Sequence, residues 1–219
     1  SKHPEFWVGE DLDEGKNNNE KDWLEVLLRN NGKSDIKYSY QKIKQINQGK
    51  GLVESIRNLK NNVLNVIVYN FVDMLSHART DMAMIRELAP DESAYRSITK
   101  SWFEHSPLYE AIQLISDLGA RLIITTDHGT IRVKKPFKIV GDRNTNTNLR
   151  YKVGKNLSYK KGKLIECRTP EDYQLPKTNI SSSYVFAMED QFFAYPNNYN
   201  HYVNHFRDTF QHGGVSLEE

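Results

Sequence analysis

The sequence predicts an α/β fold, and three observations carry that prediction. Residues 62–72 and 121–126 are rich in Val, Ile and Leu and have the length of buried strands. The chain between them carries apolar side chains at helical spacing. Strand, helix and strand in this order form the βαβ unit of a parallel sheet. Because ligands bind beyond the carboxyl ends of such strands, the residues that follow each strand are the first candidates for a site.

The other elements follow from apolar spacing and from turn residues. Before the first of these two strands we expect a helix over 22–28, with Asp22 as its N-cap and Asn31-Gly32 as its end. A strand over 38–40 follows. Gly49-Lys50-Gly51 then separates that strand from a helix over 52–59. After it we expect helices over 81–88 and 93–118, the second broken at Pro107 and capped by Gly119. Later elements are a hairpin of strands 137–140 and 151–153, a strand over 185–188, and a helix over 202–206.

Residues 131–183 differ in composition from the rest of the chain and are expected to form a basic, β-rich insertion. Up to residue 163, Asp142 is the single acidic residue of this stretch. Its cationic residues are Arg132, Lys134, Lys135, Lys138, Arg143, Arg150, Lys152, Lys155, Lys160, Lys161 and Lys163. Two interpretations stay open: an ordinary solvated face, or a surface that steers a polyanionic substrate toward a neighbouring site.

The composition is that of a globular protein without a membrane span. The 219 residues are 38% hydrophobic and 26% charged, and the net charge of +2 neither favours nor excludes a polyanionic partner. No apolar run has the length of a bilayer span, and no signal peptide is present. The single cysteine, Cys167, excludes an internal disulfide and suits a reducing compartment, so we expect a cytoplasmic protein. Because the chain opens at Ser1 and not at Met, we expect a piece of a longer protein.

Carboxylate and imidazole side chains recur at three places. Asp73 and His77 follow the first strand as D-x-x-x-H, residues 127–129 follow the second as Asp-His-Gly, and residues 212–214 are His-Gly-Gly. A helix cap and a surface histidine would explain any one of these places, but the repeat after both strands favours a site. Two carboxylates and three imidazoles can hold two divalent ions, which would clamp a transferring phosphoryl group.

The three motifs, taken in order, resemble a known family. N-F-V-D-M-L-S-H, I-T-T-D-H-G-T-I-R-V and F-Q-H-G-G-V-S-L-E-E are similar to motifs of the PglZ domain of the alkaline phosphatase superfamily. The nearest resemblance is to the PglZ effector domain of PorX-like response regulators, which govern type IX secretion in Bacteroidetes. It implies an alkaline-phosphatase-like sheet sandwiched by helices, in a partial domain over 1–219 that contains the basic insertion 131–183. It also implies that the nucleophile motif and a receiver domain lie upstream, and that the domain continues beyond Glu219.

The resemblance also implies roles for particular residues. Asp73, His77 and His212 would bind one zinc ion, and Asp127 and His128 would bind a second. The Thr or Ser nucleophile and a further Asp ligand are expected upstream of Ser1, so no catalytic residue is assigned within this chain, which is expected to be inactive alone. The candidates for substrate contacts are His105, Arg132 and Lys134.

The function implied is that of a zinc-dependent phosphodiesterase or phosphatase, the effector domain of a two-component response regulator. Its expected substrates are nucleotide or oligonucleotide phosphodiesters. A signalling partner protein and a homodimer of the full-length protein are further expectations, and no membrane partner is expected. The alternative is a non-catalytic signalling module, in which the metals are structural and the domain binds another protein. A transcription regulator without a cofactor has less support, because no helix-turn-helix motif is present.

Overall fold

The computed structural model describes residues 19–143, 145–177 and 180–219. These residues divide into two compact units, which we call the α/β unit, up to Thr125, and the β-rich unit, Thr126–Glu219. Throughout the described residues, the helices are too short or too polar to span a bilayer.

The α/β unit is built on a pair of parallel strands, β1 (Tyr38–Ile43) and β2 (Leu64–Tyr69). The chain crosses from β1 to β2 through helix α2 (Ile46–Ser55) and the 3-10 helix η2 (Ile56–Asn61), which makes a βαβ unit. The other helices of this unit are α1 (Glu20–Asn30), α3 (Phe71–Asp81), α4 (Ala83–Leu88), α5 (Glu92–Glu104) and α6 (Pro107–Asp117).

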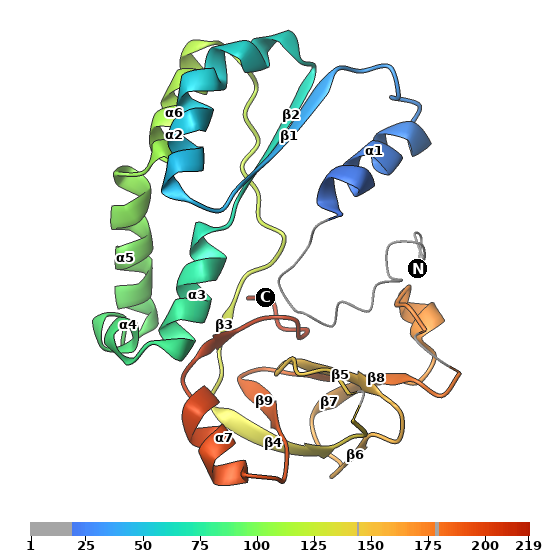
Figure 1. Ribbon diagram of the computed structural model, residues 1–219. Coiled ribbons are helices and arrows are strands. Elements are labelled where there is room, and N and C mark those ends of the chain that lie inside the picture. The colour runs from blue at the N-terminus through green and yellow to red at the C-terminus, as the bar shows by residue number, and fades with distance from the viewer. Residues whose placement is uncertain (1–18, 144, 178–179) are drawn as a thin grey trace. The chain divides into compact units, whose positions relative to one another are not determined.

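The two faces of this strand pair carry different side chains. On one face Ile43 packs against the crossover helices and against Ala111 of α6. On the other, Lys42 Nζ lies 2.9 Å from the carboxylate of Glu20 in α1, and the Tyr40 hydroxyl donates to the same carboxylate. Side chains alternate between faces along a strand. Helix α1 therefore covers one face, while α2 and α6 cover the other (Figure 1).

Several expected boundaries of the α/β unit are confirmed. Helices α5 and α6 are separate, with Pro107 as the first residue of α6. Strand β2 is shorter than the expected 62–72: it ends at Tyr69, and Asp73 lies within the helix α3 that begins at Phe71. Gly119 follows α6 with a positive φ of 65°, the left-handed conformation that glycine adopts without strain after a helix. The expected N-cap of α1 is wrong. The helix begins at Glu20 after Asn19, so Asp22 lies in its first turn, where a carboxylate still favours the helix dipole.

Two larger expectations in this unit are wrong. Gly49-Lys50-Gly51 was expected to separate β1 from a helix, but it lies inside α2. Gly49 lets the helix approach the Tyr69 hydroxyl and the ring of Pro107 closely. This tertiary packing outweighs the low helix propensity of glycine. Residues 121–126 form no strand, and the side chains of Ile123 and Ile124 are 79% and 74% exposed. The segment has the composition of a buried strand but pairs with neither β1 nor β2. Because a strand is stabilised by its pairing with a neighbouring strand, composition alone is not sufficient to form one. The βαβ unit is therefore β1–α2–β2.

The β-rich unit contains two three-stranded sheets, a short strand pair and one α-helix among its described residues. Its elements are β3 (Ile131–Arg132), β4 (Lys135–Val140), β5 (Tyr151–Gly154), β6 (Ser158–Tyr159), β7 (Leu164–Cys167), η3 (Pro170–Tyr173), β8 (Ser183–Ala187), β9 (Gln191–Ala194), α7 (Tyr199–Phe206) and β10 (Phe210–Gln211). One sheet has the order β6-β4-β9, the other has the order β5-β8-β7, and β3 pairs with β10.

Strand β9 lies at the centre of this unit's core. Its Phe192 and Ala194 pack with Val203 of α7, whereas Phe193 packs with Val185 and other residues of β8. Both faces of β9 are therefore buried, which fits its continuous apolar sequence. The strand expected over 185–188 and the helix expected over 202–206 correspond to β8 and α7.

The expected hairpin of strands 137–140 and 151–153 is wrong. Strand β4 pairs with β6 and β9, while β5 pairs with β8 in the other sheet. Two residues assigned to the basic face are also not on the surface: the side chains of Arg150 and Lys152 are completely buried. Lys152 Nζ donates to the carbonyl of Asn146 at 2.9 Å and lies 4.5 Å from the centre of the Tyr195 ring. The alternation that predicts a strand does not reveal that its charged face is turned inward.

Candidate functional site

The first candidate pair, Asp73 and His77, lies on α3. Strand β2 ends at Tyr69 and the helix begins at Phe71, so both residues belong to the first two turns of the helix. Residues four apart lie on the same side of a helix, and His77 Nε2 is 3.5 Å from Asp73 Oδ1. The His77 side chain is 62% exposed. This nitrogen and this oxygen have a spacing close to that of two ligand atoms on one ion.

Helix α5 holds the start of α3 in place. Tyr95 donates its hydroxyl hydrogen to the carbonyl of Val72 at 3.0 Å, and its oxygen lies 2.7 Å from Ser76 Oγ. The rings of Phe71 and Trp102 are stacked, with centroids 3.7 Å apart. Burial raises the pKa of Tyr95, and the nearby Asp73 carboxylate raises it further, so the phenol remains a proton donor. The turn that carries Asp73 is thereby fixed to the helix beside it.

In the β-rich unit, the pairing of β3 with β10 joins the other two motifs. Gln211 lies opposite Ile131, so the Asp127-His128-Gly129 segment before β3 runs beside the His212-Gly213-Gly214 turn after β10. The imidazole rings of His128 and His212 stack, with centroids 3.9 Å apart and planes inclined by 15°. The sequence predicted a shared site for these motifs. Within this unit the structure brings their two histidines into contact.

A hydrogen bond to the backbone engages one ring nitrogen of His128. Its Nδ1 lies 3.0 Å from the carbonyl oxygen of Gly129. Because a carbonyl can only accept, Nδ1 carries a proton in this geometry, which leaves Nε2 as the nitrogen available to a ligand. Oδ1 of Asp127 accepts from the His128 backbone N–H at 3.0 Å and lies 3.9 Å from Nε2. An imidazole nitrogen beside a carboxylate is a donor set that suits zinc.

The glycines of the His212-Gly213-Gly214 turn are required by its surroundings. Gly213 has a φ of 99°, a conformation that other residues rarely adopt. A Cβ at Gly214 would lie 2.8 Å from a guanidinium nitrogen of Arg150 and 3.0 Å from the carbonyl oxygen of Ala187. The turn is therefore packed directly against buried protein atoms.

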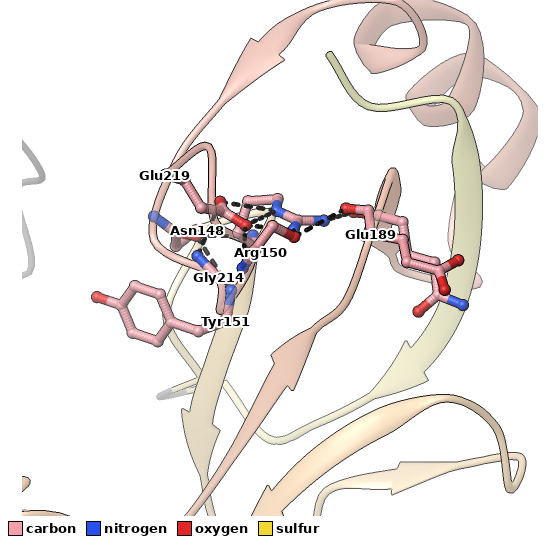
Figure 2. Close-up of polar contacts among 8 residues, drawn as sticks. Asn148, Arg150, Tyr151, Glu189, Gly214 and Glu219 are labelled. Atoms are coloured by element: carbon pink, nitrogen blue, oxygen red, sulfur yellow. Dashed lines mark hydrogen bonds and ion pairs between the residues drawn. The ribbon is translucent and has the colours of Figure 1, made fainter. Parts of the chain in front are cut away.

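A buried ion pair adjoins the turn (Figure 2). The Glu219 carboxylate accepts hydrogen bonds from Arg150 and from the backbone N–H of Gly214 at 3.0 Å, and the side chains of Arg150 and Glu219 are both completely buried. Burial alone would raise the pKa of Glu219. The hydrogen bonds from Arg150 and the Gly214 and Ser216 amides outweigh burial, so the pKa of this carboxyl is lowered. Sequence reasoning missed Glu219 and assigned Arg150 to the surface. The available signal was a carboxylate five residues after Gly214.

The three candidates for substrate contacts belong to different segments of the chain. His105 is the exposed residue that follows α5, and its Nδ1 lies 2.8 Å from the Ser101 carbonyl oxygen. Arg132 in β3 forms an ion pair with Asp208 at 3.2 Å. Lys134 is exposed between β3 and β4. Their role as substrate contacts stays a prediction.

Comparison with known proteins supplies a family match over the whole length of the chain. The family model described as "BREX system PglZ alkaline phosphatase-like domain" matches residues 1–219. A search of curated proteins found no match.

Proposed function

Because this chain belongs to the PglZ alkaline phosphatase-like family, which indicates phosphoesterase-type activity, we propose that it is the metal-binding part of a zinc-dependent phosphodiesterase or phosphatase. Its substrates would be nucleotide or oligonucleotide phosphodiesters. We further propose that the full-length protein is a cytoplasmic response regulator similar to the PorX-like proteins of type IX secretion. In that protein the nucleophile would lie upstream of Ser1, and a homodimer would be the working assembly.

The observation that carries the proposal is the contact between His128 and His212. These residues are 84 positions apart in the sequence (212 minus 128), and they belong to two motifs of the family resemblance. Two surface histidines without a shared role would gain little from stacking their rings at 3.9 Å. Joint binding of cations by neighbouring imidazoles gives a physical reason for this arrangement.

The proposed ligand sets are those that the family resemblance implies. Asp73, His77 and His212 would hold one zinc ion, and Asp127 and His128 would hold the second. The donor chemistry fits, since the Nδ1 contact with the Gly129 carbonyl leaves Nε2 of His128 as a ligand nitrogen. Bound zinc would supply Lewis-acid polarisation of a phosphoryl oxygen and neutralise developing negative charge.

The residues of this chain would bind and orient the ester. Lys134 is exposed and could contact a phosphate oxygen beside the motif loops, whereas the charge of Arg132 is partly offset by Asp208. Arg150 and Lys152 are buried and cannot contribute to steering. A steering surface would have to come from exposed residues of the basic segment, such as Lys160 and Lys161.

The test compares His128→Ala with the matched control His201→Ala in the full-length protein. His128 is 30% exposed, so its loss should leave the thermal midpoint within about 2 °C of wild type. Loss of a ligand to a catalytic ion should lower kcat/KM for an aryl phosphodiester by about 100-fold or more, together with the zinc content. His201 is exposed on α7, and its replacement should change neither quantity.

The outcomes separate the proposal from its alternative. If His128→Ala unfolds the protein, the site is structural and the non-catalytic signalling module is favoured. If His128→Ala keeps wild-type activity and zinc content, the ligand assignment is wrong.

The same assay at two ionic strengths tests the substrate class. The Debye length falls from about 30 Å to about 10 Å between about 0.01 M and 0.1 M salt. For an oligonucleotide, kcat/KM should fall steeply over this range, and charge reversal at Lys160 and Lys161 should weaken the dependence. A small aryl diester should be much less affected. Equal salt dependence for both substrates would leave the segment as a solvated face.

A further inference from the structure

The Glu219 carboxylate accepts hydrogen bonds from the backbone of the segment that begins at the His212-Gly213-Gly214 turn. Its Oε2 accepts from the Gly214 N–H at 3.0 Å, and its Oε1 accepts from the Ser216 N–H at 3.3 Å. The two oxygens also accept from Arg150 Nε at 3.0 and 3.2 Å. A carboxylate with several charge-assisted hydrogen bonds holds its partners in a narrow range of positions.

Arg150 connects this carboxylate to the core of the β-rich unit. Its guanidinium donates to the carbonyl of Gln191, the first residue of β9, and to Ser216 Oγ at 3.1 Å. Its own carbonyl accepts from the N–H of Ala187 in β8 at 2.7 Å. The guanidinium is therefore fixed by β9 and Ser216, while the backbone of Arg150 is held by β8 (Figure 2).

His212 lies between two fixed points of the backbone. On its N-terminal side, Gln211 is paired with Ile131 in the β3–β10 ribbon. On its C-terminal side, Gly214 is bound by Glu219. The backbone at His212 can turn little when both flanks are held, so the direction of its Cα–Cβ bond is set before any ligand binds.

We propose that Arg150 and Glu219 are positioning residues of the candidate site: their buried ion pair holds the His212-Gly213-Gly214 turn so that the His212 imidazole stays stacked on His128. Neither residue touches substrate or metal in this role. The expected effect on zinc binding rests on the proposed function. The expected effect on the stacking of His128 and His212 does not.

The test uses Glu219→Gln in the full-length protein, with Glu218→Gln as the matched control. Glu218 is the neighbouring residue of the same type, and its side chain is exposed. The first measurement is metal-free: the imidazole Cε1–Hε1 resonances of His128 and His212 in histidine-labelled protein. Stacked rings shift each other's resonances, so Glu219→Gln should move both signals and leave those of His201 and His205 in place. Glu218→Gln should leave all four in place.

The second measurement is zinc affinity by chelator competition, together with kcat and KM. Residues that support metal ligands typically contribute about 10–100-fold to affinity or activity. We expect a loss of that size for Glu219→Gln, with kcat falling more than KM changes, and no loss for Glu218→Gln. If Glu219→Gln fails to fold, Ser216→Ala tests the proposal in its place. It removes a single contact to Arg150, so it should change the histidine resonances and the zinc affinity in the same direction by a smaller amount.

A folded Glu219→Gln protein with wild-type histidine resonances and zinc affinity would overturn the proposal. In that case a zinc-dependent wild-type enzyme would still support the proposed function. Conversely, if the wild type binds no zinc but Glu219→Gln moves the two histidine signals, the positioning role stands and the proposed function fails.

Discussion

The two units place their candidate ligands by different physical means. In the α/β unit, Asp73 and His77 are four residues apart on α3, and the helix repeat alone puts them on one side. In the β-rich unit, His128 and His212 come from distant segments that meet through the β3–β10 ribbon. The first arrangement needs a formed helix. The second needs the whole unit to be folded.

The two units also support their candidate ligands in different ways. A helix that holds its own residues in register needs support at one end, which Tyr95 supplies through neutral hydrogen bonds. A turn between distant segments has no local repeat to hold it, and here a buried Arg150–Glu219 pair takes that role. Buried pairs add little net stability against apolar replacements, but removing one partner leaves an uncompensated charge inside the protein. The β-rich unit should therefore be the more sensitive one to single substitutions around its motif.

The largest expected effect is that of Arg150→Ala. It leaves the buried Glu219 carboxylate without its main partner and should lower the free energy of unfolding by about 3–5 kcal/mol. Arg143→Ala, an exposed arginine of the same unit, should change it by less than about 0.5 kcal/mol. Denaturant unfolding of the full-length protein measures both. Equal effects of the two substitutions would contradict the special role of the pair.

The pH dependence of this effect has a defined sign. The pKa of Glu219 is lowered in the folded state from its ordinary value of 4.5. The stabilisation is therefore complete above that value and is lost as the pH falls through the lowered pKa. The difference between wild type and Arg150→Ala should shrink in acid.

An intermediate effect is expected from Gly129→Ala. A Cβ at Gly129 would collide with the carbonyl oxygen of Glu218, so the segment before β3 and the C-terminal segment would have to separate. The cost should be about 1–3 kcal/mol. Gly51→Ala in α2 of the other unit is the contrasting substitution, because nothing lies within 4 Å of its Cβ and alanine favours a helix by about 0.5–1 kcal/mol. If thermal unfolding shows that both substitutions change the thermal midpoint in the same direction, the expected difference between the two units is wrong.

The smallest effect is expected from Tyr95→Phe in the α/β unit. It removes the hydroxyl that bonds Val72 and Ser76 and should cost about 1–2 kcal/mol. The i to i+4 spacing of Asp73 and His77 survives, so zinc affinity of the full-length protein should fall by less than it does for Glu219→Gln. Tyr109→Phe, at a side chain that is 39% exposed, is the control. A larger loss of zinc affinity for Tyr95→Phe than for Glu219→Gln would show that α3 is the more fragile part.

Features that depend on neighbouring residues could be predicted from the sequence. These include strand β2, the break between α5 and α6 at Pro107, the left-handed glycine after α6, and the spacing of Asp73 and His77. The family follows from motifs that stand in order along the chain, and the match over residues 1–219 bears it out. Each of these signals is carried by residues within a few positions of one another, where propensity and periodicity act.

Features that depend on distant partners could not be predicted from the sequence. Residues 121–126 have the composition of a strand but do not pair with β1 or β2. Composition alone does not show which strand a segment pairs with. Arg150 is buried because a carboxylate 69 positions later neutralises it, while Lys160 in the same basic segment stays exposed. His128 meets His212 because β3 pairs with β10, in a two-residue ribbon too short to give a periodic pattern. Pairing and charge burial are settled by the free energy of long-range contacts, and that free energy is not encoded in any local stretch of the chain.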